Sequence, residues 1–557
     1  MKLQIMTIPT IHGAMIHNRP HRPGAQASPD RSAIGPRFGC SLLAAVGLAI
    51  VPGFVPFAAA ETSERPNILF ISIDDMNDWV GPLALEGNPL AETPNLDRLA
   101  EWGTTFTNAH TPAAACHPAR VAIMTGIHPA TTGITTNVFS DKPGPSWREH
   151  PLLENAVTLS QHFRDHGYFA AGAGKIYHSL QWGPWDENDP DTWDLYLDPG
   201  EGSGPIPRQI RAPEEVYNPP EFFGRRYGYF TWGPIDAADD EMSDAKVVDW
   251  AIEQLQTPRD QPLFLAVGIF RPHMPWEVPT QYFDMYPLDE IELPPYREDD
   301  LLDAWVHGRR GWHQFVVQNE QWKHIVQSYL ASITFADAQV GRLLDAVEAE
   351  GLRENTIIVL WSDHGMHIGE KDNWEKFTVW ERSTRVPFFI TAPGVSEPGG
   401  RSSRPVNLLD MYNTLIDLAD LPPPRDQDPE GESLVTFLRD PASDQPTEAS
   451  VTSYDEFHGL RTDHFRYIWY PHELEELYDH RADPNEFENL AYDPQHREVL
   501  DAHREMMRSQ TGAEITDGDP IVPPEFELLP NHRLRRAEFT PMSELVRRAR
   551  AEHDATE

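Results

Sequence analysis

Four short apolar runs, each followed at once by polar side chains, constrain the fold more than any other feature of this 557-residue chain. The runs span residues 67–73, 168–173, 263–270 and 356–361. Continuous apolar runs of this length are typical of strands buried on both faces of a parallel sheet. Helical patterns alternate with them, at residues 94–102, 159–166, 245–256 and 322–350. The alternation predicts an α/β fold with a mostly parallel central sheet that helices flank on both faces.

Acids, histidines and a lysine follow directly after these predicted strands. They are Asp74 and Asp75 after the first run, Lys175 and His178 after the second, His273 after the third, and Asp363 and His364 after the fourth. In open parallel sheets, ligands bind beyond the carboxyl ends of the strands. One polar strand end is usually just solvated, but four of them together predict a functional site at this edge of the sheet.

A cysteine stands at the start of another predicted helix. In the segment that begins at Cys116, Pro118 suits the first turn of a helix and Gly126 suits its end. The free N–H groups and the positive end of the dipole at a helix N-terminus attract an anion. Arg120 lies about one turn further on, and we expect it to reach back to the same place. This pattern predicts an anion-binding position at Cys116.

A basic, Pro-rich segment followed by the apolar stretch 41–60 has the pattern of a secretory signal peptide, which we expect to be cut after Ala60. The alternative is an uncleaved membrane anchor, which Pro52, Gly53 and Pro56 disfavour. The prediction places the mature protein outside the cell or in the periplasm. Cleavage leaves Cys116 as the one cysteine, which then forms no internal disulfide and is a candidate for chemistry. The alternative is a buried cysteine that acts as a small hydrophobe.

The charge balance limits the partners of the chain. With 45 basic and 87 acidic residues, the formal net charge is −42, which repels the phosphate backbone of nucleic acids. We therefore expect no nucleic-acid partner and no stable membrane partner. An anionic substrate requires a local basic pocket in so acidic a protein. Hydrophobic residues make up 40% of the chain, which is enough for a sizeable core.

Three aspartates and a histidine among the strand-end residues form a candidate metal site. Asp74, Asp75 and Asp363 offer hard oxygen ligands, and His364 adds a nitrogen. Such a set suits one oxygen-preferring divalent cation. The alternative for each aspartate is a helix cap or a surface charge, but their placement at two strand ends favours the metal.

The segment from Cys116 to Arg120 resembles the C-x-P-x-R motif of sulfatases, in which the cysteine is oxidised to formylglycine. It stands downstream of a strand that ends in Asp-Asp and upstream of Ser-Asp-His-Gly at 362–365. Further segments are similar to those of the iduronate-2-sulfatase-like group: residues 174–178, 271–276, 375–377 and 476–490. The resemblance covers most of residues 65–500. It identifies the chain as a member of the formylglycine-dependent sulfatases, within the alkaline phosphatase superfamily.

This resemblance implies an alkaline-phosphatase-like α/β domain and a smaller C-terminal subdomain that carries an antiparallel sheet. We expect a signal peptide over 1–60, the catalytic domain over 61–440, the C-terminal subdomain over 441–529 and a basic helical tail over 530–557. The implied reaction is hydrolysis of a sulfate ester on a sulfated saccharide, with a uronate-containing glycan as the candidate substrate. The implied cofactor is one Ca²⁺, although His364 leaves Mg²⁺ or Mn²⁺ open. Maturation implies a formylglycine-generating enzyme as a partner.

The resemblance also implies roles for individual residues. Formylglycine at position 116 is the nucleophile and a ligand of the cation, and it is held together with the anion by Arg120 and Lys175. His178 is the base that removes a proton from the second hydroxyl, so that sulfate is expelled after the attack. His273 protonates the leaving oxygen, and Lys376 binds the sulfate. We expect Trp276 to line the pocket.

Two other functions fit the same sequence. A phosphodiesterase or phosphonate monoester hydrolase uses the same nucleophile chemistry on an anion of similar shape. A secreted acidic glycan-binding protein without activity would keep an unmodified thiol at Cys116. Residues 181–240, rich in Trp, Pro and Gly, are expected to form long loops above the sheet edge.

Overall fold

The computed structural model describes residues 65–137, 146–178, 189–197, 230–305, 310–471 and 474–554. The predicted signal peptide at residues 1–60 lies outside the described residues, as does most of the loop region over 181–240. Among the helices that the structure describes, none combines the length and the apolar character needed to cross a membrane.

An eight-stranded sheet forms the centre of the fold, in the order β13-β2-β12-β9-β1-β7-β4-β5. The strands are β13 (Gly400–Ser402), β2 (Thr104–Phe106), β12 (Phe388–Thr391), β9 (Thr356–Ser362), β1 (Asn67–Asp74), β7 (Leu263–Pro272), β4 (Phe169–Gly174) and β5 (Leu195–Leu197). Strands β9, β1, β7, β4 and β5 are parallel, whereas β12 runs antiparallel to both of its neighbours. The mostly parallel sheet predicted from the four apolar runs is therefore confirmed.

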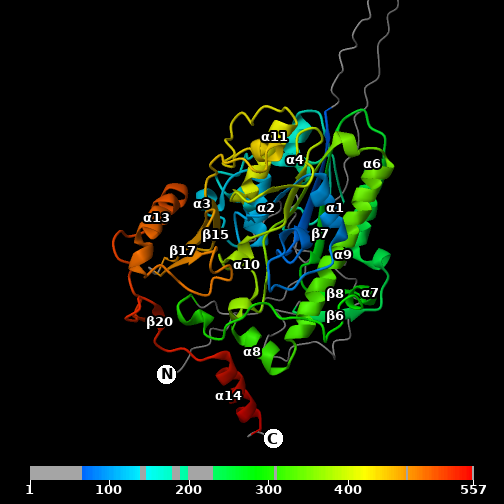
Figure 1. The fold of residues 1–557 in the computed structure, drawn as a ribbon. Coiled ribbons are helices and arrows are strands. Elements are labelled where there is room, and N and C mark those ends of the chain that lie inside the picture. Colours follow the sequence, from blue (N-terminus) through cyan, green and yellow to red (C-terminus); the bar gives the residue numbers. More distant parts are fainter. Residues whose placement is uncertain are drawn as a thin grey trace, which may run out of the picture. The chain divides into compact units, whose positions relative to one another are not determined.

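Helices cover both faces of this sheet because β1 and its neighbours are apolar on both sides. Leu69, Ile71 and Ile73 pack with α1 (Pro94–Trp102), α6 (Ser243–Gln256) and α9 (Trp322–Ala349) in one core. Ile68 and Phe70, which point to the opposite face, pack with α2 (Cys116–Thr125), α4 (Leu159–Asp165) and α11 (Met411–Leu418) in a second core. Figure 1 shows α6 and α9 on one side of the sheet and α2, α4 and α11 on the other.

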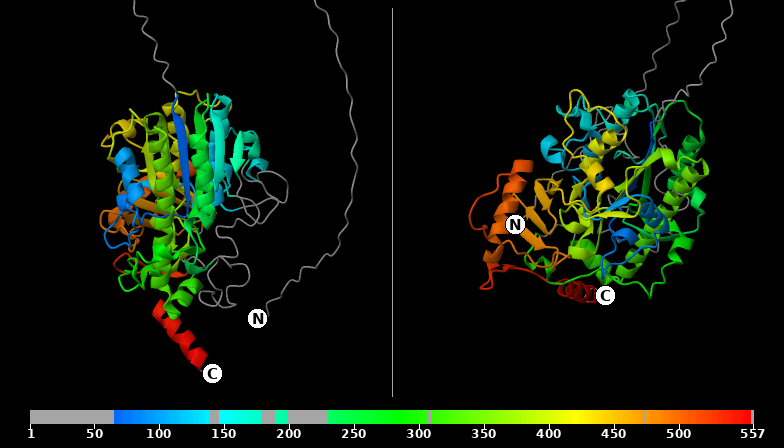
Figure 2. Two further views of the ribbon diagram at one scale, coloured as in Figure 1. Left: turned by 90° about the vertical axis from the view of Figure 1, so that its right-hand side faces the viewer. Right: turned by 45° about the horizontal axis from the view of Figure 1, so that its top comes forward.

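A four-stranded antiparallel sheet follows in the C-terminal part of the chain, as the fold prediction required. It consists of β15 (Ser450–Tyr454), β16 (Phe457–Arg461), β17 (Phe465–Trp469) and β18 (Glu475–Asp479). Helix α13 (Arg497–Thr511) packs on β16 and β17, and the third core lies between them. Figure 2 shows this helix, in orange, on the outside of the strands. The boundary placed at residues 440/441 stays a prediction.

Short elements complete the described fold. The two-stranded sheets pair β10 (His367–Ile368) with β11 (Trp374–Glu375), β14 (Val406–Asn407) with β3 (Ala109–His110), β6 (Trp232–Ile235) with β8 (Trp276–Pro279), and β19 (Phe526–Leu528) with β20 (Leu534–Arg536). The shorter helices are α3 (Pro129–Thr132), α7 (Thr280–Phe283), α8 (Arg310–Gln318), α10 (Glu381–Thr384) and α12 (Val435–Arg439). The last helix, α14 (Met542–Asp554), packs on α8 (Figure 1).

Candidate active site

The carboxyl ends of four parallel strands bring the predicted residues to one edge of the sheet. Ile73 of β1 lies opposite Ser362 of β9 and Ile269 of β7, and Gly174 of β4 lies opposite Gly268 of β7. The next residues along each strand therefore emerge side by side. These are Asp74 and Asp75 from β1, Asp363 and His364 after β9, Lys175 and His178 after β4, and His273 after β7.

Asp75 turns its backbone sharply at the end of β1. Its φ of 62° lies in the left-handed region, which is strained for an aspartate. The Tyr329 hydroxyl of α9 donates to the carbonyl of Asp75 at 2.7 Å, and the amide of Asp75 donates to Asp363 Oδ1 at 3.1 Å. These contacts hold the strained conformation and bring the ends of β1 and β9 together.

Cys116 is the first residue of α2, as predicted, and is fully buried. Its Sγ lies 3.1 Å from His364 Nε2 and donates to Asp75 Oδ1 at 3.9 Å. Burial alone would raise the pKa of the Cys116 thiol, but Lys175 and Lys376 outweigh it and lower that pKa. A thiol that packs only as a small hydrophobe has apolar neighbours, so the charged surroundings favour the chemical role.

The acids of the candidate metal site are all fully buried, as is His364. Asp75, Cys116 and His364 form one group whose ligand atoms lie within 4.8 Å of one another, and Asp74, Cys116 and Asp363 form another. Burial and the neighbouring Asp74 raise the pKa of Asp75 to about 7, in spite of the opposing effect of Lys376. Asp363 and Cys116 raise the pKa of His364 to about 9, which more than offsets the effect of its burial.

Arg120 reaches back to the acids that surround Cys116, and Cys116 is among the groups that raise the pKa of the Arg120 guanidinium. Its Nε donates to Asp363 Oδ2 at 2.8 Å and its Nη2 to Asp74 Oδ1 at 3.0 Å. Its Nη1 donates to Ser72 Oγ at 2.8 Å and to the carbonyls of Lys175 and Ile176. From its position one turn into α2, the side chain reaches the ends of β1, β4 and β9. Arg120 is therefore placed to orient the carboxylates.

Two lysines reach the same acids from opposite parts of the chain. Lys175 Nζ donates to Asp74 Oδ2, and Lys376 Nζ lies 2.9 Å from both carboxylate oxygens of Asp75. The pKa of Lys376 is raised because the attraction of Asp75 outweighs the effect of burial. Burial alone would raise the pKa of Asp74, but the attraction of Lys175, followed by His273 and Arg120, outweighs it and holds that pKa well below its usual value. These lysines form the local basic pocket that an anionic substrate requires.

The two predicted acid–base histidines lie in this pocket, and the surroundings lower the pKa of each. His273 Nε2 faces Asp75 Oδ2 at 3.6 Å, while its Nδ1 lies 2.6 Å from the carbonyl of Met274. Burial and the positive charges of Lys376 and Lys175 hold the pKa of His273 well below its usual range. Burial and Lys175 have the same effect on the pKa of His178, whose ring lies edge-on to that of His117 at 6.4 Å.

The expectation that Trp276 lines the pocket is wrong. Trp276 is fully buried in β8, where its ring packs edge-on against Phe230 and Tyr329. The short strand turns this side chain into the core that contains α9, and the position three residues after His273 does not determine that direction.

Several residues that support the site carried no signal in the sequence. Thr111 Oγ1 donates to the carbonyl of Asp363 at 2.5 Å, and Tyr329 and Ser72 hold Asp75 and Arg120 as described above. Ser362 was identifiable only by its place before Asp363, and its hydroxyl accepts the amide of Met76 at 2.9 Å. Thr111 and Tyr329 come from distant parts of the chain, Ser72 lies within β1, and all three resemble ordinary core residues.

A second group of potential metal ligands lies away from this site. Glu381, His480 and Glu486 lie within ligand distance of one another. Arg466 pairs with both glutamates, and Arg461 also pairs with Glu381 at 3.2 Å. The arginines neutralise these carboxylates, so the group is a buried ion-pair network that joins α10 to the C-terminal sheet.

Comparison with known proteins shows the family to which the chain belongs. The model of the family described as Sulfatase matches residues 66–421, and that described as N-sulphoglucosamine sulphohydrolase, C-terminal, matches residues 369–512. A sulfatase from Formosa agariphila is 35% identical over 456 residues, which cover 80% of this chain and 86% of that protein. Iduronate 2-sulfatase from Homo sapiens is 29% identical, over 68% of this chain and 75% of that protein.

The fold is shared more widely. The crystal structure of the phosphonate monoester hydrolase of Agrobacterium radiobacter superposes with a TM-score of 0.61 at 22% identity, over 85% of this chain and all of that one. Fold and site together define a hydrolase of anionic esters. The chain belongs to the sulfatase family, and the protein is a sulfuric ester hydrolase.

Proposed function

We propose that the protein hydrolyses a sulfate ester of a carbohydrate, with formylglycine formed from Cys116 and one divalent cation as its catalytic groups. The observation that carries the proposal is the position of Cys116. Its Sγ lies 3.1 Å from His364 Nε2 at the start of α2, next to buried acids, and two lysines lower its pKa. Such surroundings suit a nucleophile that must meet both a cation and an anion.

The residues present fit a divalent cation. Three buried carboxylates and one imidazole converge, and burial, followed by the charge of Asp74, raises the pKa of Asp75. A bound cation would favour the ionised carboxylate. We assign its ligands to Asp74, Asp75, Asp363, His364 and the group at position 116, and we favour Ca²⁺ because most of the donors are oxygens. When bound, the cation acts as a Lewis acid toward the nucleophile and the sulfate.

The chain's own residues supply binding and proton transfer. Formylglycine in its hydrated form would provide a hydroxyl nucleophile at position 116, where α2 begins. Lys175 and Lys376 neutralise the oxygens of the sulfate, and Arg120 keeps Asp74 and Asp363 in place. His178 is held neutral by burial, and a neutral imidazole is the form that accepts a proton, as its role as base requires.

His273 is assigned to protonation of the leaving oxygen. Lys376 and Lys175 contribute to its low pKa, and a bound sulfate opposes their charge. Substrate binding therefore raises the pKa of His273 and favours the protonated form that an acid needs. The contact of its Nδ1 with the Met274 carbonyl fixes the ring so that Nε2 faces the site.

A carbohydrate substrate is inferred from the relatives. Human iduronate 2-sulfatase bears the name of a uronic acid, and this chain covers 75% of its length. The proposal includes secretion or export to the periplasm after cleavage of residues 1–60, and maturation by a formylglycine-generating enzyme.

The state of residue 116 tests the proposal most directly. The intact mass of the peptide that contains it should decrease by the difference between –CH₂SH and –CHO when a host with the converting enzyme makes the protein. Cys116→Ala should abolish turnover and leave the thermal unfolding temperature within about 2 °C. Substantial activity in that variant would contradict the nucleophile assignment.

Metal removal and substrate choice provide the second test. A chelator should abolish activity, and Ca²⁺ should restore it better than Mg²⁺ or Mn²⁺. Rescue by Zn²⁺ alone would instead indicate a two-metal phosphohydrolase. Rates on matched sulfate and phosphonate esters should favour sulfate, whereas the reverse order would support the phosphonate monoester hydrolase alternative.

A further inference from the structure

Lys376 lies near the end of a strained segment, residues 369–377, which we name the lysine hairpin. Four residues in it that are not glycine have a left-handed backbone: Lys371 (φ 53°), Asp372 (φ 53°), Glu375 (φ 104°) and Phe377 (φ 73°). Such a backbone conformation is strained for these residue types and persists only where surrounding contacts enforce it. The contacts that hold the hairpin therefore determine where the ammonium group of Lys376 lies.

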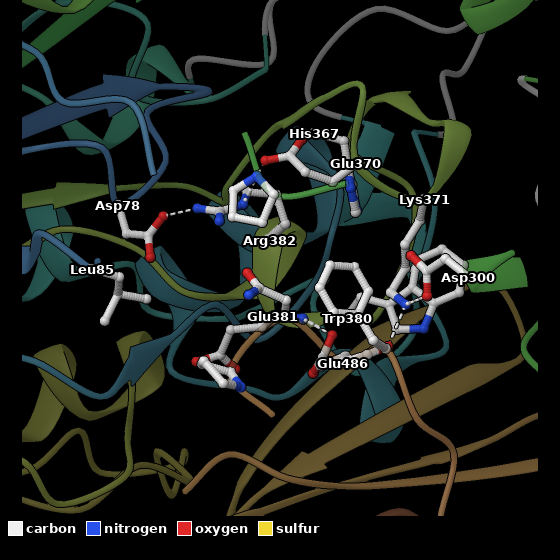
Figure 3. Close-up of a pocket in the computed structure, with 14 residues that line it drawn as sticks. Asp78, Leu85, Asp300, His367, Glu370, Lys371, Trp380, Glu381, Arg382 and Glu486 are labelled. Carbon is white, nitrogen blue, oxygen red and sulfur yellow. Dashed lines mark hydrogen bonds and ion pairs between the residues drawn. The ribbon is translucent and has the colours of Figure 1, made fainter. Parts of the chain in front are cut away.

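The first anchor of the hairpin is Lys371. Its Nζ donates to Asp300 Oδ1 at 3.0 Å and to the carbonyl of Glu486 at 2.6 Å, and it lies 5.0 Å from the centre of the Trp380 ring. Lys371 lines a second pocket, distinct from the candidate active site, together with Asp300 and Trp380. Figure 3 shows Lys371 pointing toward Asp300, on the side of this second pocket where Trp380 lies. This anchor ties the hairpin to the segment that follows the C-terminal sheet.

The second anchor is Asp372, which is buried. Its carboxylate accepts hydrogen bonds from Arg310 Nε and from the Tyr296 hydroxyl, both at 2.8 Å. His313, one turn along α8 from Arg310, accepts from Trp374 Nε1 at 3.2 Å. Helix α8 thus holds the hairpin at Asp372 and at Trp374, which lie four and two residues before Lys376.

Arg310 also holds the C-terminal tail, residues 530–554. Its Nη2 donates to the carbonyl of Thr540 at 2.9 Å, and its guanidinium lies 4.8 Å from the centre of the Phe539 ring. Further along the same helix, Gln314 Nε2 donates to the carbonyl of Leu545 at 3.3 Å. The second family match ends at residue 512, so these tail contacts lie outside the matched region.

We propose that the C-terminal tail positions Lys376 for sulfate binding through Arg310 and Asp372. The inference rests on the proposed function, which assigns sulfate binding to Lys376. Arg310 and Asp372 are positioning residues because neither reaches the site itself. The tail restricts the Arg310 guanidinium, Arg310 fixes Asp372, and Asp372 holds the strained turn that presents Lys376.

The inhibition constant of inorganic sulfate tests this chain of contacts, because it measures anion binding and does not depend on the amount of active enzyme. Asp372→Asn and Arg310→Gln should raise it about tenfold, the scale on which orienting groups act on a bound ligand. Phe539→Ala, in the tail itself, should raise it about threefold, and KM should rise in parallel while kcat changes less. Arg310→Lys, which keeps the charge, should recover part of the loss.

Arg550→Gln is the matched control. Arg550 Nη2 donates to the carbonyl of Gln318, so this residue docks the tail on α8 without touching Arg310. Its loss should leave the inhibition constant unchanged. If Arg310→Gln fails to fold, Phe539→Ala keeps the test decisive, because Phe539 is only half-buried.

Lys376→Met separates the two levels of the proposal. If it raises the inhibition constant while Asp372→Asn, Arg310→Gln and Phe539→Ala do not, the positioning role is overturned and the proposed function stands. If Lys376→Met leaves the inhibition constant unchanged, the sulfate-binding role of Lys376 fails, and the positioning role fails with it.

Discussion

At the scale of single residues, the site separates two histidines by what surrounds each of them. His273 faces Asp75 at 3.6 Å, and Lys376 and Lys175, the proposed anion-binding lysines, contribute to its lowered pKa, so the proposed mechanism makes its protonation depend on the substrate. The ring of His178 lies 6.4 Å from that of His117, and after burial the charge of Lys175 is the largest cause of its lowered pKa. In the proposed mechanism, His273 therefore donates a proton and His178 accepts one.

His273→Ala tests the acid role by a ratio of two rates. The variant should lose about 10²–10⁴-fold on a sugar sulfate, the range typical of acid catalysis, and should retain most of its rate on an aryl sulfate whose phenolate leaves unaided. The ratio is measured on one preparation, so it does not depend on how much of the enzyme carries formylglycine.

His464→Ala, an exposed histidine of the C-terminal sheet region, is the matched control and should change neither rate. Equal losses on both substrates in His273→Ala would remove this residue from the acid role. They would leave it a part in substrate binding.

At the scale of elements, the sequence pattern placed the helices and strands well. Predicted helix 94–102 is α1 to the residue, and the predicted strands end within two residues of β1, β4, β7 and β9. The reason is physical, since a strand buried on both faces and a capped amphipathic helix leave clear patterns in a single sequence. The candidate residues at the strand ends followed from the same patterns.

Contacts between distant segments left no such pattern. The direction of Trp276 depends on how the short strand β8 pairs with β6, and the partners of Arg120 depend on the register of β1 with β9. The lysine hairpin has a backbone that its residue types disfavour, so propensity points away from it. Only the packed structure determines these features.

The close contact of β4 with β7 leads to a prediction at this scale. A Cβ on Gly268 would lie 2.3 Å from the backbone of Lys175, where no flexible side chain can move aside. Gly268→Ala should therefore destabilise the protein by about 1–3 kcal/mol and lower kcat/KM, because it displaces Lys175. Thermal unfolding and steady-state kinetics measure the two effects.

Gly167→Ala, at the other end of β4, is the control. Gly167 has a φ of 91° and open space around it, so the variant should cost about 1–2 kcal/mol of backbone strain with kcat/KM unchanged. If both variants lose activity alike, displacement of Lys175 is not the cause.

At the scale of the whole molecule, negative charge dominates. The formal net charge of −42 means that acidic groups repel one another over the surface, while some arginines are buried in ion pairs such as Arg120–Asp74 and Arg466–Glu381. Buried pairs such as Arg120–Asp74 are screened little by salt, whereas repulsion between exposed acids is screened strongly.

Salt should therefore stabilise the protein. Raising NaCl from about 0.1 M to about 1 M shortens the Debye length from about 10 Å to about 3 Å, so the unfolding temperature should rise by at least about 2 °C. Sucrose at matched osmolality, which does not screen charge, should reproduce only part of the change. A lower unfolding temperature in salt would mean that exposed pairs such as Arg98–Asp345 outweigh the repulsion.

The complete burial of Cys116 limits when this residue can be converted relative to folding. No enzyme can reach this thiol once α2 is packed and once β9 and the lysine hairpin, which follow later in the chain, have closed around it. If Cys116 is converted as proposed, conversion must happen while the chain is still open, during synthesis or export. Oxidation of the cysteine and folding then compete in time. A molecule that folds first keeps its thiol and stays inactive, however much converting enzyme it meets afterwards.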